Sequence, residues 1–168
     1  MLCVVSHDAG GAEVLASYVA RMTEPCCLVL EGPALKVFER RLRRVSPVSL
    51  EHALACCNQI LTGSSWQSDL EWRAIVAAKA AGKPVTTFLD HWGHYRERFI
   101  RHSSECLPNF IWVGDAVAEN LAYSLFPSIP VQLVPNPYFE DIREEISRYE
   151  SRGAIFAGNG LRVLFVCE

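Results

Sequence analysis

The stretch "LCVVSHDAGGAEVL" (residues 2–15) decides the fold class of this chain. Residues 2–6 form an apolar run of strand length, and apolar residues recur with a helical period over 12–22. Gly10 and Gly11 lie between these segments, where we expect a sharp turn. A buried strand that leads through a short turn into a helix is typical of a βαβ unit, in which the sheet is parallel.

The same alternation of short apolar runs and amphipathic segments continues along the chain. Strands are predicted at 2–6, 26–30, 47–50, 59–62, 85–89, 109–113 and 131–134. Helices are predicted at 12–22, 33–42, 69–81, 115–125 and 139–152, with a short one ending at 57 and mostly loop at 92–107. Strands that are apolar throughout are typical of a parallel sheet covered on both faces. The sequence therefore predicts an α/β domain over residues 1–152, with a doubly wound, Rossmann-like, mostly parallel sheet of six to seven strands and helices on both faces.

Residues 153–168 allow two interpretations. The segment 153–160 is typical of a linker, and 161–167 ("LRVLFVC") is another apolar run of strand length. This last strand is either the seventh strand of the same sheet or the first strand of a second Rossmann-like half.

Composition excludes several classes of function. The 168 residues carry 16 Lys and Arg against 19 Asp and Glu, and a net charge of −3 argues against nucleic acid as the main partner. The seven cysteines are odd in number and form no CxxC, so we expect no disulfide framework and a reducing cytoplasmic location. No run of about 18 apolar residues occurs, so no transmembrane helix is expected. Four arginines at 39–44 ("ERRLRR") leave a peripheral contact with a membrane open.

Polar stretches follow three of the predicted strands. In an open parallel sheet, ligands bind outside the carboxyl ends of the strands, where the strand order reverses. For the common order 3-2-1-4-5-6, that crevice lies between the strands at 2–6 and 59–62. The three stretches "SHDAGGAE", "TGSSWQSD" and "LDHWGHYRER" converge on this edge.

The first stretch offers a candidate base and a turn suited to an anion. His7 ends the first strand, and its ordinary pKa lies near working pH, as a general base requires. Gly10 and Gly11 allow a ligand close to the backbone, and the following helix start favours an anion. The stretch is not GxGxxG, so no dinucleotide site is expected. Asp8 is a further candidate binding residue of this stretch. Alternatively, His7 and Asp8 only cap the helix.

The second stretch combines hydroxyls, an amide and an indole before a predicted helix. Its candidate binding residues are Ser64, Ser65, Trp66 and Gln67. Hydroxyl and amide groups suit sugar hydroxyls or phosphate, and an indole suits a sugar ring or a base. A capping box from Ser68 to Glu71 is also predicted, but capping does not explain the other polar residues.

The third stretch is the densest. Asp90 and His91 form a candidate catalytic pair at a strand end. Its candidate binding residues are His94, Arg96 and Arg98, and Asn136 follows a later strand at the rim. Arginines clamp phosphate or carboxylate groups, whereas a solvated loop with Arg–Glu pairing is the alternative. His91 and His94 are three residues apart, but no further ligand spacing accompanies them, so no metal site is expected.

The order of these motifs resembles the N-terminal half of glycosyltransferase-like proteins of the GT-B type, in a bacterial group linked to surface polysaccharide biosynthesis. The resemblance covers residues 2–142 through "SHDAGGAE", "LTGSSWQSDLE", "FLDHWGHYRERF", "IWVGDAVAENL" and "VPNPYFEDI". It implies two Rossmann-like halves that face a cleft, with no metal or cofactor. It also implies a nucleotide-sugar donor bound mainly by the C-terminal half and a sugar or lipid-linked acceptor bound by this half. His7 occupies the position of the base, and Asp90 with His91 is the competitor.

This resemblance favours the interpretation of 161–167 as the first strand of a donor-binding half. We then expect the isolated chain to be inactive and the full-length protein to transfer a glycosyl group. Two alternatives remain. The chain is a stand-alone small-anion-binding or regulatory domain without catalysis, or it is half of a sugar-nucleotide 2-epimerase, which shares the two-half architecture.

Overall fold

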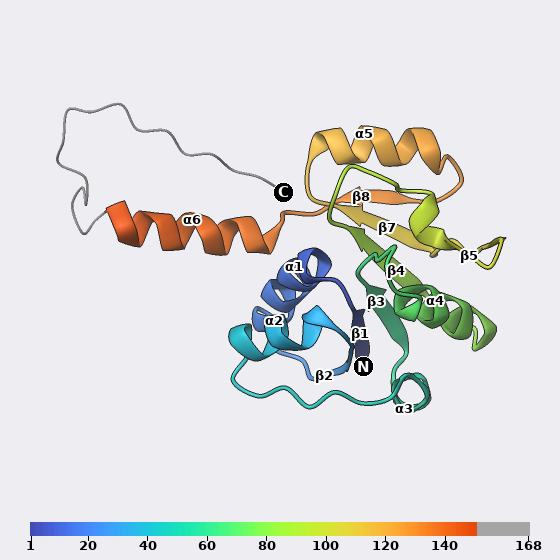
Figure 1. Ribbon diagram of the computed structural model, residues 1–168, viewed down its shortest axis with the longest axis horizontal. Coiled ribbons are helices and arrows are strands. Elements are labelled where there is room, and N and C mark those ends of the chain that lie inside the picture. Colours follow the sequence, from blue (N-terminus) through green and yellow to red (C-terminus); the bar gives the residue numbers. More distant parts are fainter. Residues whose placement is uncertain (151–168) are drawn as a thin grey trace.

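Six parallel strands form the main sheet of the computed structural model, which describes residues 1–150 (Figure 1). The strands are β1 (Leu2–Ser6), β2 (Cys26–Leu30), β3 (Gln59–Thr62), β4 (Val85–Leu89), β7 (Phe110–Val113) and β8 (Val131–Leu133). Their order across the sheet is β2-β1-β3-β4-β7-β8. This confirms the doubly wound α/β fold, whereas the predicted linker and strand at 153–168 lie outside the described residues.

Helices cover both faces of the sheet. They are α1 (Ala9–Ala20), α2 (Pro33–Arg41), α3 (Leu50–Cys56), α4 (Leu70–Ala80), α5 (Ala116–Leu125) and α6 (Pro137–Glu150). α1 and α2 pack on one face around Val4, and α3, α4 and α5 pack on the other around Val5. Successive strand residues therefore enter different cores, which is why most strand residues are apolar. α6 continues from the end of β8 and contacts α1 (Figure 1).

The loop after β4 contains only short elements. A 3₁₀ turn, η1 (Glu97–Phe99), precedes the antiparallel pair β5 (Ile100–Arg101) and β6 (Ser104–Glu105). Phe99 is buried and packs edge-to-face on Phe126, with their ring centroids 5.5 Å apart. The loop is thereby anchored to the core at its middle.

The predicted strand at 47–50 does not form, so the predicted order 3-2-1-4-5-6 is wrong. Pro47 has no N–H to donate to a ladder, and the Ser49 side chain accepts from the His52 N–H at 3.2 Å and caps α3. The strand at 59–62 is therefore the third along the chain. The reversal of strand order lies between β1 and β3, which is the pair of strands that the sequence predicted.

Helix α1 begins at Ala9, three residues earlier than predicted. The Ala12 N–H donates to the Asp8 carbonyl at 3.0 Å, so Gly10 and Gly11 lie in the first helical turn. Neither glycine has a positive φ, and the expected glycine turn is therefore wrong. Both allow close approach instead, because a Cβ at Gly11 would lie 3.5 Å from the Gly63 Cα and one at Gly10 would collide with Asp90.

None of the helices in residues 1–150 combines the length and apolar character that spanning a bilayer requires.

Candidate functional site

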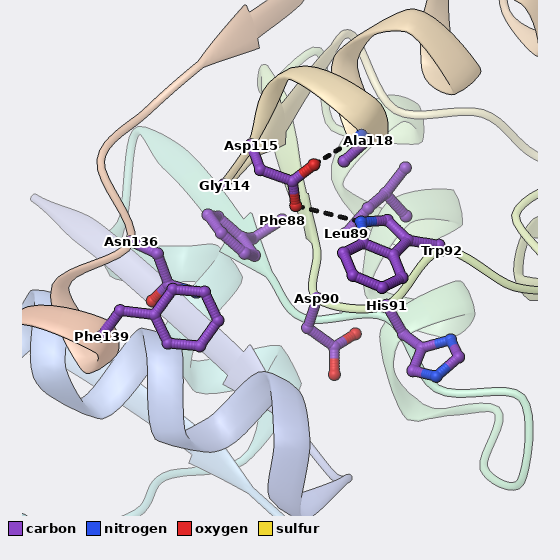
Figure 2. A pocket seen from close by; sticks show the side chains of 10 residues that line it. All are labelled: Phe88, Leu89, Asp90, His91, Trp92, Gly114, Asp115, Ala118, Asn136 and Phe139. Carbon is purple, nitrogen blue, oxygen red and sulfur yellow. Dashed lines mark hydrogen bonds between the residues drawn. The ribbon is translucent and has the colours of Figure 1, made fainter. Parts of the chain in front are cut away.

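A pocket of about 290 Å³ lies at the carboxyl ends of β4 and β7 (Figure 2). Figure 2 shows the Phe88, Asn136 and Phe139 side chains along one side of the pocket and the Trp92 indole on the other. The complete lining comprises Phe88, Leu89, Asp90, His91, Trp92, Gly114, Asp115, Ala118, Asn136 and Phe139. The pocket thus lies two strand pairs away from the reversal between β1 and β3.

One carboxylate fixes the Trp92 wall and the start of α5 together. The Asp115 Oδ1 atom accepts from the Ala118 N–H at 2.8 Å and caps the helix. The Asp115 Oδ2 atom accepts from the Trp92 indole N–H at 3.0 Å. The indole is 59% exposed, so this hydrogen bond holds an otherwise free aromatic ring at the pocket edge.

The opposite wall depends on close packing at Gly114. A Cβ at Gly114 would lie 3.3 Å from the Asn136 Cβ and 3.5 Å from the Phe88 ring. The Asn136 side chain accepts from the Tyr138 N–H at 3.0 Å and so holds the turn into α6. The absence of a side chain at Gly114 lets this turn, which carries Asn136 and Phe139, close the pocket.

Asp90 is part of a nearly buried polar cluster beside the pocket. Its Oδ1 atom accepts from the Ser64 hydroxyl and from Arg98 Nη1, each at 3.2 Å. The Asp90 and Arg98 side chains are 13% and 9% exposed. Arg98 also donates to the Ser64 carbonyl at 2.7 Å, so Asp90 is held by charge and by backbone geometry.

The second oxygen of Asp90 lies against the first turn of α1. A Cβ at Gly10 would come within 2.5 Å of the Asp90 Oδ2 atom. The helix start that the sequence predicted as an anion site is therefore faced by the protein's own carboxylate.

His7 lies at the end of β1 with its ring oriented by Asp8. The His7 Nδ1 atom is 2.8 Å from the Asp8 Oδ1 atom. A Cβ at Gly32 would come within 2.5 Å of the His7 Nε2 atom, and Gly32 has a φ of +54°. His7 therefore faces the loop between β2 and α2 and does not line the pocket.

Glu71 is a functional candidate that the sequence analysis missed. The predicted capping box is wrong, because the Ser68 hydroxyl accepts from the Leu70 N–H and Glu71 accepts from the His7 backbone N–H at 2.7 Å. The residue is only 3% exposed, and this burial raises the pKa of Glu71 to about 7. Its position in the sequence predicted only a helix cap, so no sequence pattern marked Glu71 as a buried carboxyl group with a raised pKa.

The remaining predicted site residues lie on two loops around these clusters. Trp66 stacks on His94 with ring centroids 5.0 Å apart, and the Ser65 hydroxyl accepts from the Gln67 N–H. His91 lines the pocket, but its ring points away from the other lining side chains (Figure 2). Arg96 pairs with Glu105 at 2.7 Å, so the two arginines of the predicted clamp have separate partners. Phe88, Trp92, Asp115 and Phe139 join the pocket without having been predicted as binding residues.

The pocket suits an uncharged ligand with hydroxyl groups. Two carboxylates and one amide line it, together with the Phe88, Trp92 and Phe139 rings, the His91 imidazole and no Lys or Arg. Residues 1–150 hold no group of three His, Cys, Asp or Glu side chains arranged for a metal ion. Hydroxyls of a ligand would find acceptors here, whereas a phosphate would meet carboxylates of its own sign.

Comparison with known proteins found no family model, no curated protein and no solved structure that matches this chain. The resemblance to GT-B proteins therefore remains a prediction from the motifs.

Proposed function

We propose that this domain is the acceptor-binding half of a glycosyltransferase of the GT-B type, and that the pocket takes one sugar unit of the acceptor. The observation that carries this proposal is the pairing of aromatic walls with carboxylate and amide acceptors in one small pocket. A sugar ring has apolar C–H faces that pack on aromatic rings and hydroxyls that need acceptors. The volume of about 290 Å³ lies at the lower end of small-ligand pockets, which suits a single ring.

Asp90 is the base in this proposal. Ser64 and Arg98 occupy its Oδ1 atom, and no donor within residues 1–150 binds Oδ2. Oδ2 accepts the proton of the acceptor hydroxyl as that oxygen bonds to the anomeric carbon of the donor sugar. The bond from this carbon to the nucleoside diphosphate breaks, and the leaving phosphate oxygen keeps the electron pair. Asp90 fits this role better than His7, because Asp90 lines the pocket and His7 does not.

The small-anion alternative receives less support from the charges. Arg98 is held by Asp90 and two backbone carbonyls, and Arg96 is held by Glu105. An anion in the pocket would therefore meet Asp90 and Asp115 without a free cation among the lining residues.

Ligand-observed NMR on the purified chain tests the proposal. Glucose, galactose, mannose and N-acetylglucosamine are the probes, with inorganic phosphate as the competing class. We expect saturation transfer to at least one sugar, with weak affinity in the millimolar range. Phe139→Ala and Asp90→Asn should remove this signal, whereas Phe110→Ala, an exposed aromatic at the opposite end of β7, should keep it.

Binding of phosphate without binding of any sugar would favour the anion alternative, and binding of neither would contradict the proposal. Loss of the signal in His7→Ala but not in Asp90→Asn would move the site to the end of β1.

A further inference from the structure

Hydrogen bonds from Arg98 and Arg101 hold two loops at the carboxyl edge of the sheet, and we call these two loops the frame. They are the loop at 63–69 after β3 and the loop at 90–96 after β4, and these strands are neighbours in the sheet. Arg98 donates to the Ser64 carbonyl on the first loop at 2.7 Å and to the Gly93 carbonyl on the second at 3.2 Å. Arg101 donates to the Ser65 and Ser68 carbonyls at 2.6 and 2.8 Å. Both arginines thus hold backbone positions on these loops.

This frame presents exposed aromatic rings, which we call the aromatic platform: Trp66, Trp92 and His94. Trp66 is 56% exposed although it stacks on His94 with an interplanar angle of 5°. Trp92 is 59% exposed and is fixed to Asp115. One residue separates Trp92 from His94, so their Cα atoms lie at most about 7 Å apart. Exposing an indole to water is unfavourable, and a cluster of exposed aromatic side chains is typical of a binding site.

The charges around the platform disfavour a nucleic acid strand. Arg98 is paired with Asp90, and Arg96 with Glu105. Both guanidinium groups of the clamp are thus paired with carboxylates, and that of Arg101 donates to backbone carbonyls. Binding to a phosphate backbone depends instead on available Lys and Arg. Flat rings with polar Gln67 beside them suit instead the C–H faces and hydroxyls of a neutral sugar.

We infer that the aromatic platform is a second sugar subsite, continuous with the pocket through Trp92, and that the acceptor is an oligosaccharide chain rather than a single sugar. The inference rests on the proposed function, because the pocket takes the reacting unit. The platform indicates that the substrate is an oligosaccharide, because Trp66 and His94 would stack on a second sugar unit of that oligosaccharide. Because Arg98 and Arg101 already hold the loop backbones without a ligand, we expect little conformational entropy to be lost when that sugar binds.

Calorimetric titration with sugars of increasing length tests the inference on the purified chain. The probes are glucose, cellobiose and cellotetraose, the matching maltose series, and the matching N-acetylglucosamine series. In at least one series, we expect the tetrasaccharide to bind about tenfold more tightly than the monosaccharide. Trp66→Ala should remove this gain, so that the tetrasaccharide binds no more tightly than the monosaccharide. Phe110→Ala, which removes another exposed ring, 45% exposed, at the opposite end of β7, should retain the gain.

The two proposals fail in different ways. Monosaccharide binding with no gain in any series, or a gain that survives in Trp66→Ala, would overturn the platform and leave the pocket standing. The absence of any sugar binding would overturn both. His94→Ala serves as a second variant, since it removes the stacking partner while Trp66 stays in place, and we expect it to lower the gain only in part.

Discussion

Glu71 and Asp90 are two carboxyl groups near the start of α1, and only Asp90 has a positively charged partner. Asp90 has Arg98 as a counter-charge at 3.2 Å. Glu71 is buried with one backbone donor, the His7 N–H, and its Oε2 atom has no hydrogen-bond partner within residues 1–150. Desolvation by burial therefore dominates and raises the pKa of Glu71 to about 7.

The raised pKa of Glu71 predicts a pH-dependent stability. Because the folded pKa of about 7 exceeds the unfolded value of 4.5, the native state binds the extra proton between these pH values. The free energy of unfolding should therefore fall as pH rises through this window and level off above it. Glu71→Gln mimics the neutral form and should remove this slope, so at pH 8 the variant should be more stable by about 1–3 kcal/mol.

Urea unfolding at pH 5, 6, 7 and 8 measures this difference. Glu39→Gln, at an exposed position on α2, is the matched control and should follow the wild-type curve. Parallel curves for the wild type and Glu71→Gln would show that Glu71 ionises at its ordinary pKa.

At the scale of elements, apolar runs predicted the strands well and polar residues predicted local contacts poorly. The strands at 2–6, 26–30, 59–62 and 85–89 have the predicted bounds, because most of their side chains enter the cores on the two faces of the sheet. The segment 47–50 is also short and partly apolar, but one helix cap and one proline decide against a strand there. Whether such a short segment forms a strand thus depends on single hydrogen bonds, which the periodicity of apolar residues does not predict.

Gly10 in the first turn of α1 gives a prediction at this scale. Ala suits a helix better than Gly by about 1 kcal/mol, but its Cβ would collide with the Asp90 Oδ2 atom. We expect Gly10→Ala to displace the Asp90 carboxylate and abolish sugar binding, while the free energy of unfolding changes by less than about 2 kcal/mol. NMR titration and urea unfolding measure the two effects.

Gly82→Ala is the control for Gly10→Ala. Gly82 follows α4 with a φ of +68° and nothing within 4 Å of an added Cβ, so only backbone strain results. This variant should be destabilised by about 1 kcal/mol and bind sugar normally. Normal sugar binding by Gly10→Ala would contradict the role of Asp90 in the pocket.

At the scale of the whole molecule, the site is displaced from the reversal of strand order. The backbones of Gly11 and Gly63 approach closely between β1 and β3, and Ser64, Asp90 and Arg98 fill the space beside them. The open volume lies instead between β4, β7 and α6. The order of elements predicted the edge that carries the site, but Phe88 and Phe139 are indistinguishable from core residues in sequence. Their place in the pocket depends on how α6 docks, which is a tertiary contact.

The docking of α6 gives the last prediction. Asp141 on α6 forms ion pairs with Arg21, which caps the end of α1, and with Arg41 on α2, each at 2.9 Å. Desolvation by burial raises the pKa of Asp141, but the hydrogen bond from Arg21 and the two positive charges outweigh it and hold the pKa below its usual value. A lowered pKa means that this contribution to stability is present above the unfolded pKa of 3.8 and is lost as pH falls through the folded value.

We expect Asp141→Asn to loosen α6 at neutral pH and, because Phe139 and Asn136 precede Asp141 on the same segment, to weaken sugar binding by about threefold to tenfold. Hydrogen exchange should rise in α6 while the amides of β1, β3 and β4 stay protected, because local opening of α6 leaves the sheet intact. Glu145→Gln, an exposed carboxyl on the same helix, is the control and should change neither measurement. Unchanged exchange in α6 of Asp141→Asn, together with unchanged affinity, would mean that apolar packing alone positions the pocket wall.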